Sequence, residues 1–309
     1  MFKQIKGLAG IWTVLVVSAC ASNPSIEVDY DLDARNQLMT EGRLHMNAGR
    51  TQEAITSYMG AVDLKPDAEV WHRVGTLYLG QGEEYPAMTA FEQAVDQSPD
   101  YLPALQDMGL LLLKWKQKDR AQAVLTHVLK RDENRWQIHN ALGVIADLES
   151  RHAAAMAHYQ QALALNPDSA DVMNNMGYSN FLVDDPVAAS DYLVDALRHD
   201  GNHKVAWLNL AKTMARKGRY ADAFNILAQR QERPFAYHDV GYIALLNGDF
   251  LRAENYLTKA LNDSPTHFDE AYRNRSTARN RLIGNMEGTV VSRRGAEYPY
   301  CIGLSVSDC

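Results

Sequence analysis

The sequence lacks the residue patterns on which most enzymes depend. It has three cysteines in 309 residues, and none of them has a neighbour that would activate a thiolate. It contains no glycine-rich phosphate loop and no serine nucleophile elbow. Its two closest histidine pairs, His152 with His158 and His199 with His203, do not share one face of an unbroken helix. We therefore expect a non-enzyme with no metal site and no cofactor.

Positive charge is also scarce. The chain has 31 Lys and Arg against 38 Asp and Glu, which gives a net charge of −7 at pH 7. Nucleic-acid binding requires clustered Lys and Arg to meet the phosphates, so we expect no nucleic-acid partner. The hydrophobic content of 46% is ordinary, and the length allows one or two domains.

The first twenty residues have the pattern of a secretory signal. Lys3 and Lys6 give a positive start, and a mostly apolar run from 8 to 17 follows, which is too short for a comfortable membrane span. The ending at 17–20, VSAC, resembles the bacterial lipobox. That resemblance implies that the signal peptide is residues 1–19 and that Cys20 carries acyl chains, which together hold a protein stably at a bilayer. The alternatives are an ordinary cleaved signal and an uncleaved anchor.

The residues after Cys20 specify where such a lipoprotein would go. Ala21 stands where an Asp would retain the protein in the inner membrane, so the sorting pattern implies the outer membrane. Residues 20–34 are predicted to be a solvated acidic tether, because they contain four acidic side chains: Glu27, Asp29, Asp31 and Asp33.

A pair of small residues recurs along the chain at a spacing near 34 residues. The pairs are Gly42–Ala54, Gly75–Ala87, Gly109–Ala121, Gly143–Ala155, Gly177–Ala189, Ala211–Ala223 and Gly241–Ala253. Such a period indicates a solenoid of helix pairs. Without large side chains at either place, the two helices of a unit can approach closely and interlock. Prolines that would end the second helices follow several units: Pro66, Pro99, Pro167 and Pro265.

The units resemble the tetratricopeptide repeat (TPR). Residues 71–78, WHRVGTLY, followed by Ala87, Phe91, Ala94 and Pro99, agree with that family's pattern almost completely. The resemblance implies an all-α fold, a right-handed superhelical solenoid of about seven helix pairs in residues 35–267, followed by a capping helix. The repeats are assigned to 35–67, 68–101, 102–135, 136–169, 170–203, 204–233 and 234–267. Repeat six is four residues short, which predicts an early end of its second helix and a local kink.

In this family the first helix of each repeat lines a concave groove. The fifth position of that helix has side-chain amides in three adjacent repeats, and an amide offers both a donor and an acceptor. The resemblance therefore implies a peptide or helix docking site, in which the amides could grip an extended backbone. Its predicted residues are Gln106, Asn140, Asn174, Tyr178, Phe181, Lys212 and Tyr242. The alternative is that the amides are only solvated and the aromatic side chains pack between repeats.

Beyond the repeats, residues 268–283 are predicted to form a capping helix over the last repeat, with Tyr272 and Leu282 buried. The helix has four arginines: Arg273, Arg275, Arg279 and Arg281. They are predicted either to be a solvated outer face or to bind an acidic partner or another anionic surface. Residues 284–309 have no helical period and are predicted to be an irregular tail. Cys301 and Cys309 remain once Cys20 is acylated, and such an even pair in an oxidising compartment suggests a disulfide.

Three segments carry a narrower resemblance, to the TadD family of repeat lipoproteins in Flp/Tad type IV pilus assembly systems. They are residues 173–197, 207–227 and 238–261, which include MNNMGY, GRYADAF and HDVGY. The resemblance implies an assembly factor at the periplasmic face of the outer membrane. Its partners would be the outer-membrane secretin or other Tad pilus components. The alternative is a general envelope adaptor that recruits cell-wall enzymes, or a pilotin of another secretion system.

Overall fold

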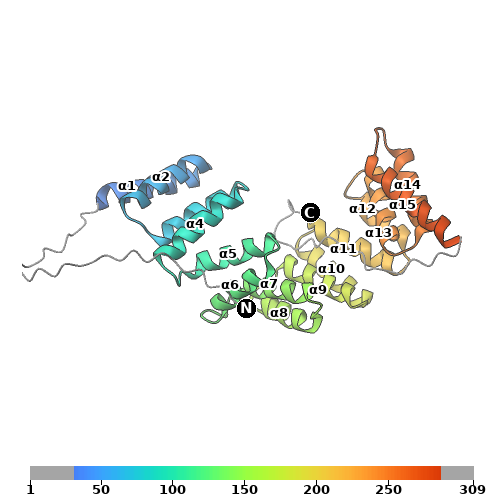
Figure 1. Ribbon diagram of the computed structural model, residues 1–309, viewed down its shortest axis with the longest axis horizontal. Coiled ribbons are helices and arrows are strands. Elements are labelled where there is room, and N and C mark those ends of the chain that lie inside the picture. The colour runs from blue at the N-terminus through green and yellow to red at the C-terminus, as the bar shows by residue number, and fades with distance from the viewer. Residues whose placement is uncertain (1–30, 287–309) are drawn as a thin grey trace, which may run out of the picture.

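The computed structural model describes residues 31–286, and all regular structure in that range is helical (Figure 1). Fourteen helices form seven consecutive pairs, and one more helix follows. We call the first helix of a pair helix A and the second helix B. The pairs are α1 (Leu32–Asn47) with α2 (Thr51–Leu64), α3 (Ala68–Gly80) with α4 (Glu84–Gln97), α5 (Leu102–Lys114) with α6 (Lys118–Leu129), α7 (Trp136–Leu148) with α8 (His152–Leu165), α9 (Ala170–Leu182) with α10 (Pro186–His199), α11 (Lys204–Arg216) with α12 (Tyr220–Ala228), and α13 (Arg233–Leu246) with α14 (Phe250–Asp263). The final helix is α15 (Asp269–Met286). The predicted all-α solenoid of seven helix pairs is confirmed.

The glycine of helix A is the point at which the two helices of a pair meet. The repeating Ala of helix B is buried, but the side chain above the glycine is the large residue four positions after that Ala. Residues four apart lie on one face of a helix, which explains this difference from the prediction. A Cβ added at Gly177 would lie 2.6 Å from Leu193, and one added at Gly241 would lie 2.6 Å from Leu257. Only glycine leaves room for those side chains without a shift.

The turn between helices A and B has the same backbone conformation in every repeat. One residue of each turn adopts a positive φ: Gly49, Gly82, Lys116, Ser150, Asp184, Gly218 and Gly248. This left-handed conformation favours glycine and is strained for other residues. Four repeats therefore use the preferred residue and three do not.

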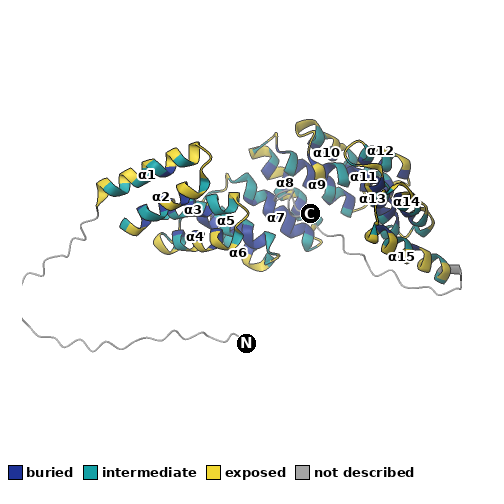
Figure 2. Cartoon of the chain, turned by 90° about the horizontal axis from the view of Figure 1, so that it is seen from above, coloured by how far each residue is buried: buried dark blue, intermediate teal, exposed yellow. Residues whose placement is uncertain are grey.

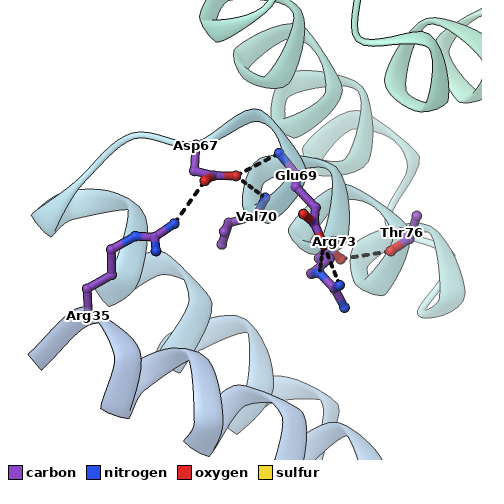
Figure 3. Close-up of polar contacts among 6 residues, drawn as sticks. All are labelled: Arg35, Asp67, Glu69, Val70, Arg73 and Thr76. Atoms are coloured by element: carbon purple, nitrogen blue, oxygen red, sulfur yellow. Dashed lines mark hydrogen bonds and ion pairs between the residues drawn. The ribbon is translucent and has the colours of Figure 1, made fainter. Parts of the chain in front are cut away.

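Short polar side chains begin many of the helices and also join neighbouring repeats. Asp67 accepts hydrogen bonds from the backbone N–H groups of Glu69 and Val70 at 2.9 and 3.2 Å, which caps α3 (Figure 3). Its other oxygen accepts from Arg35 of α1 at 2.9 Å, so one carboxylate caps a helix and ties two repeats together. Side-chain caps also begin α1, α9, α10, α11 and α14, from Asp31, Ser169, Asp185, His203 and Asp249.

Successive repeats do not stack equally closely along the chain. From α5 onward each A helix lies against the next one, in the series α5, α7, α9, α11, α13 and α15. In the first two repeats, contact with the following repeat runs mainly through α2 to α3 and α4 to α5. The first helix is also the most exposed of the early ones, as Figure 2 shows. The described solenoid therefore has a tightly stacked central part and a more open N-terminal part.

The predicted end of the tether differs from the structure, and the predicted early end of the second helix in repeat six does not. The tether was expected to extend to residue 34, but α1 begins at Leu32, because Asp31 accepts from the backbone N–H of Ala34 and caps the helix. Repeat six does have a short second helix: α12 ends at Ala228 after 9 residues. The kink expected beside it stays a prediction. Residues 1–30 and 287–309 lie outside the described range, and so do the signal peptide, most of the tether and most of the tail.

The final helix α15 covers the last repeat, but not with the predicted side chains. Tyr272 is exposed and Leu282 is half-buried, whereas Ala271 and Ala278 are fully buried. These two alanines are seven positions apart on one face, and their small side chains let α15 lie close to α14. The contact depends on small residues, as the contacts within the repeats do, so the aromatic residue points to solvent.

Candidate partner-binding wall

The A helices from α5 to α15 form a continuous surface, which we call the A-helix wall. All seven predicted groove residues lie on these helices, but most of them are not open to a partner. The exposed fractions of Asn140, Asn174, Phe181 and Lys212 are 7%, 0%, 3% and 9%. Gln106, Tyr178 and Tyr242 are half-buried. Asn140 and Asn174 therefore do not line an open groove, and this correction follows from the close stacking of neighbouring A helices.

The buried amides bind one another across three A helices. Asn209 of α11 donates to Asn174 at 3.0 Å, Asn174 donates to Asn175 at 3.2 Å, and Asn175 donates to Asn140 of α7 at 2.9 Å. We call this chain the amide relay. It satisfies groups that would otherwise be costly to bury, and it links repeats four, five and six in one register. The amides thus hold repeats together and are neither solvated nor available as rungs for a partner.

A second buried polar cluster lies beside the relay, around Asp147 at the end of α7. Tyr159 donates to one carboxylate oxygen at 2.9 Å, and Ser179 donates to the other at 2.9 Å. The Nδ1 atom of His152 lies 2.8 Å from that second oxygen. Burial, followed by the charge of Asp147, raises the pKa of Tyr159 well above its ordinary value of 10. These contacts join α7, α8 and α9 through a single carboxylate.

Toward the C-terminal end, rings and cations alternate on the A-helix wall. Tyr178 and Phe181 of α9 stack with their ring centroids 5.9 Å apart. The Lys212 ammonium lies 5.9 Å from the Tyr178 centroid, and the Arg216 guanidinium lies 4.9 Å from the Phe181 centroid. Arg216 is exposed and Tyr178 is half-buried, so this edge of the wall can be reached from solvent. Such an edge offers a partner aromatic surface and a positive charge together.

Burial lowers the pKa of Lys212 to about 8, and the nearby charge of Asp239 opposes that shift. On the next A helix, His238 lies 3.2 Å from the Asp239 carboxylate through Nδ1 and 3.2 Å from the Asn274 amide through Nε2. The His238 ring also stacks with Tyr242, at a centroid distance of 6.4 Å. Tyr242 therefore packs on His238, which in turn contacts Asn274 of α15.

At its N-terminal end the A-helix wall continues onto α3 and is more open. Thr76 of α3 is exposed, and Leu79 of α3 and Leu110 of α5 are half-buried. Leu110 keeps some exposure, whereas Leu113 on the same helix is buried. This part offers a mixed apolar and polar surface.

Two polar contacts order this open part of the wall. The Nε2 atom of His72 lies 2.8 Å from the Asp107 carboxylate, so α3 is tied to α5. Arg135 donates to the side-chain oxygen of Gln106 at 3.1 Å. Gln106 is therefore the one predicted amide that is not fully buried, and its oxygen already has a donor.

The sequence interpretation missed several residues that organise the wall. Asn175 and Asn209 complete the amide relay, Ser179 binds Asp147, and Arg216 covers Phe181. A signal for two of them was present. The pairs Asn140–Asn175 and Asn174–Asn209 are each 35 residues apart, one more than the repeat period. That offset places the two residues of each pair on adjacent A helices, one position apart in the repeat, so the pairs are not visible when only identical repeat positions are compared.

Several predicted features lie outside the described residues. Cys20, Cys301 and Cys309 fall outside residues 31–286, so the acylation and the disulfide stay predictions. In the described range, no helix combines the length and the apolar character that a membrane crossing requires. The same range contains no group of three or more His, Cys, Asp or Glu side chains arranged to hold a metal ion.

Comparison with known proteins identifies the repeats. Sequence models of the tetratricopeptide repeat family match residues 38–67, 68–101 and 107–170. No curated protein sequence matches the chain.

Similar solved structures include a tetratricopeptide repeat protein from Parabacteroides merdae, at 13% identity and a TM-score of 0.60, covering 80% of this chain and 100% of that one. Pseudomonas aeruginosa pilF is similar at 18% identity and a TM-score of 0.51, covering 68% of this chain and 96% of that one. MamA from Desulfovibrio magneticus RS-1 is similar at 21% identity and a TM-score of 0.50, covering 56% of this chain and 98% of that one. At these identities the likeness establishes the fold alone.

Proposed function

Because the chain belongs to the tetratricopeptide repeat family, a family of protein-interaction scaffolds, we propose that it holds a partner protein on its A-helix wall without catalysing a reaction. The proposed setting is the periplasmic face of a bacterial outer membrane, with the chain anchored through acyl chains on Cys20. The proposed task is assembly of a Tad/Flp type IV pilus secretion system, by helping its secretin ring to assemble or localise.

The observation that carries the binding proposal is an edge of the wall at which the exposed Arg216 and the half-buried Tyr178 pack against the buried Phe181 and Lys212. Aromatic and arginine side chains are the residues that most often dominate the binding energy of protein interfaces. Here each ring has a cation above it, and the amide relay fixes the helices behind them. The edge is therefore preorganised, which reduces the entropy that a partner loses on binding.

The proposal for location depends on the sequence near Cys20. A charged start, an apolar run and small residues before the cysteine fit a lipoprotein signal. The solenoid would then stand beside the membrane on the short acidic segment before α1. The choice of a Tad system depends on the resemblance in residues 173–197, 207–227 and 238–261. Two of these segments contain most of α9 and of α11, including the residues of this edge.

Co-purification from envelope extracts tests the partner. The bait is a soluble chain that starts at Ala21, and the wall variant combines Tyr178→Ala with Arg216→Glu. We expect the bait to capture the Tad secretin and the wall variant to lose at least about tenfold of that capture, the size of effect expected from removing an interface anchor. A control variant, Arg120→Glu, changes an exposed residue of α6 away from the wall and should bind normally.

Two further results bear on the setting. Mass spectrometry of the exported protein should find an acylated Cys20 at its N-terminus. A strain that lacks the gene should lose its pili. Capture of no secretin or other Tad component, together with intact pili in that strain, would falsify the Tad assignment. Capture of a cell-wall enzyme, or of a secretin from another system, would favour the general envelope adaptor.

A further inference from the structure

A second aromatic surface runs across α12, α13 and α14, of which only α13 is an A helix of the wall. Phe224 of α12 stacks on Tyr237 of α13, with ring centroids 4.2 Å apart and planes inclined by 13°. Tyr237 lies 6.2 Å from Tyr256 of α14, and Tyr256 lies 6.4 Å from Tyr220. We call these four rings the aromatic strip. Phe224, Tyr237 and Tyr256 are half-buried, whereas Tyr220 is buried. The strip is therefore partly accessible at the surface and is anchored in the core at Tyr220.

Three exposed cations lie over the strip. The Arg233 guanidinium lies 5.8 Å from the Phe224 centroid and 5.5 Å from the Tyr237 centroid. The Lys259 ammonium lies 5.8 Å from the Tyr237 centroid and 5.1 Å from the Tyr256 centroid. Arg252 lies 5.2 Å from the Tyr220 centroid. Arg233 also lies 3.6 Å from the Asp263 carboxylate, and Arg252 lies 2.5 Å from the Asp249 carboxylate. These carboxylates offset part of the positive charge, and the ring faces position the cations beside apolar surface without neutralising them.

The strip lies in the basic part of an otherwise acidic molecule. Residues 204–286 contain 13 Lys and Arg against 8 Asp and Glu, whereas residues 31–203 contain 14 against 25. A surface of rings and cations within a basic region selects a partner segment that combines carboxylates with apolar side chains. The chain itself contains such a segment immediately before α1: residues 25–30 read SIEVDY, and Asp31 follows.

Reach excludes docking within one molecule. The eleven residues from 21 to 31 can extend at most about 40 Å. Six steps separate α1 from α13 along the stack of A helices, and at roughly 9 Å a step they span about 55 Å. Figure 1 also shows α1 and α12 to α14 at opposite ends of the described solenoid. We infer that residues 25–30 of one copy dock on the aromatic strip of a second copy.

Such a contact joins different surfaces of the two copies, head to tail. A heterologous contact of this kind does not close after two subunits, so it produces rings or open chains of copies. The carboxylates of Glu27 and Asp29 would meet Arg233 and Lys259, and the apolar side chains between them would pack on the rings.

Sedimentation velocity of the chain from Ala21 to Cys309 tests this contact. Low salt strengthens charge contacts, and a reductant keeps Cys301 and Cys309 from linking copies covalently. We expect the average mass to rise with protein concentration. The association should weaken at least about tenfold when residues 21–30 are removed, or when Arg233→Glu is combined with Lys259→Glu, since each lost pair is worth up to about fivefold. Arg198→Glu, an exposed change on α10, should leave the association unchanged.

A charge swap makes the test specific. Adding Glu27→Lys and Asp29→Lys to the reversed strip should restore the association, which a merely misfolded variant would not do. As a second measurement, a synthetic peptide of residues 21–33 should bind the chain that starts at residue 31 and should compete with self-association. A chain that stays monomeric, an association unaffected by loss of residues 21–30, or a strip that binds other acidic peptides but not this one would overturn the inference.

Discussion

At the residue scale, a buried tyrosine at one position of the repeat has, within residues 31–286, a hydrogen-bonded hydroxyl in repeat four and an unpartnered hydroxyl in repeat one. Tyr58 and Tyr159 stand at equivalent places in repeats one and four, and both rings lie over the glycine of helix A. Both side chains are buried. The Tyr159 hydroxyl donates to Asp147, whereas the Tyr58 hydroxyl has no hydrogen-bond partner among the described residues. The cost of losing each hydroxyl should therefore differ.

Replacing each tyrosine by phenylalanine tests this difference. Tyr159→Phe should lower the free energy of unfolding by about 1–3 kcal/mol, because it removes a donor from a buried carboxylate. Tyr58→Phe should leave that free energy unchanged or raise it slightly, because the lost hydroxyl is buried without a partner. Urea denaturation followed by circular dichroism measures both. Equal losses in the two variants would contradict the assigned role of Asp147.

Lys212 links stability to pH. Its pKa in the folded protein is about 8, below the ordinary value of 10.5, because burial disfavours the charged form. The unfolded chain therefore binds more protons than the folded chain between these two values. Stability contributed by this group consequently increases as the pH rises through that window.

The variant Lys212→Met isolates the effect. At pH 7 it should be more stable than the parent chain, because it removes a buried charge. The difference should shrink by about 1–2 kcal/mol between pH 7 and pH 9.5, as the parent lysine loses its proton in the folded state. Denaturation curves at both pH values provide the measurement, and a difference that is constant with pH would argue against a depressed pKa.

At the scale of the element, the turn between helices A and B is under the same constraint in every repeat. Ser150 has φ of 58° and Gly218 has φ of 76° at equivalent turns. A residue with a Cβ is strained there by roughly 1–2 kcal/mol, whereas glycine is not. The stability that glycine gains by avoiding this strain is partly offset, because glycine loses more backbone entropy on folding.

Exchanging the residue types should shift stability in opposite directions. Ser150→Gly should raise the free energy of unfolding by about 0.5–1 kcal/mol, the strain relieved less the entropy lost. Gly218→Ala should lower it by about 1 kcal/mol, and backbone strain alone would be the cause, since nothing lies within 4 Å of an added Cβ. Thermal unfolding compares the two variants, and a loss of stability in Ser150→Gly would show that the turn is held by something other than φ.

At the scale of the whole molecule, the stack is uneven. Adjacent A helices are in close contact from α5 onward, and the amide relay and Asp147 reinforce repeats four to six. Contact between A helices is sparser in the first two repeats, where His72 and Asp107 provide a polar contact between α3 and α5. In a solenoid each repeat is stabilised mainly by its neighbours, so local opening should begin where those contacts are weakest.

Hydrogen exchange read by mass spectrometry can locate this opening. Amides of α1 and α2 should exchange at least about tenfold faster than amides of α7 and α9, since a difference of 1.4 kcal/mol in opening free energy corresponds to tenfold. The variant Asn175→Ala should accelerate exchange in α7, α9 and α11 more than in α1 to α4, because it interrupts the amide relay. Uniform protection along the chain would contradict the uneven stack.

Most of the fold was predictable from the sequence, because its determinants are local or repeat with the period. In six of the seven pairs a glycine of helix A meets the large residue of helix B, and Ala211 stands at that place in the other pair, so the small residue recurs at the same spacing. The groove was less predictable. The sequence places Asn140 and Asn174 on A helices, but their exposure depends on how closely the next A helix approaches.

The sequence by itself determined the helix pairs, their number and the early end of α12, since turns, small residues and helix periodicity act over short distances. The tertiary structure decided which side chains remain available to a partner. Close stacking turned Asn140 and Asn174 into part of a buried relay with Asn175 and Asn209, and left Tyr178 and Arg216 accessible at its edge. The physical reason is that burial is a property of the distance between repeats, which no single repeat encodes.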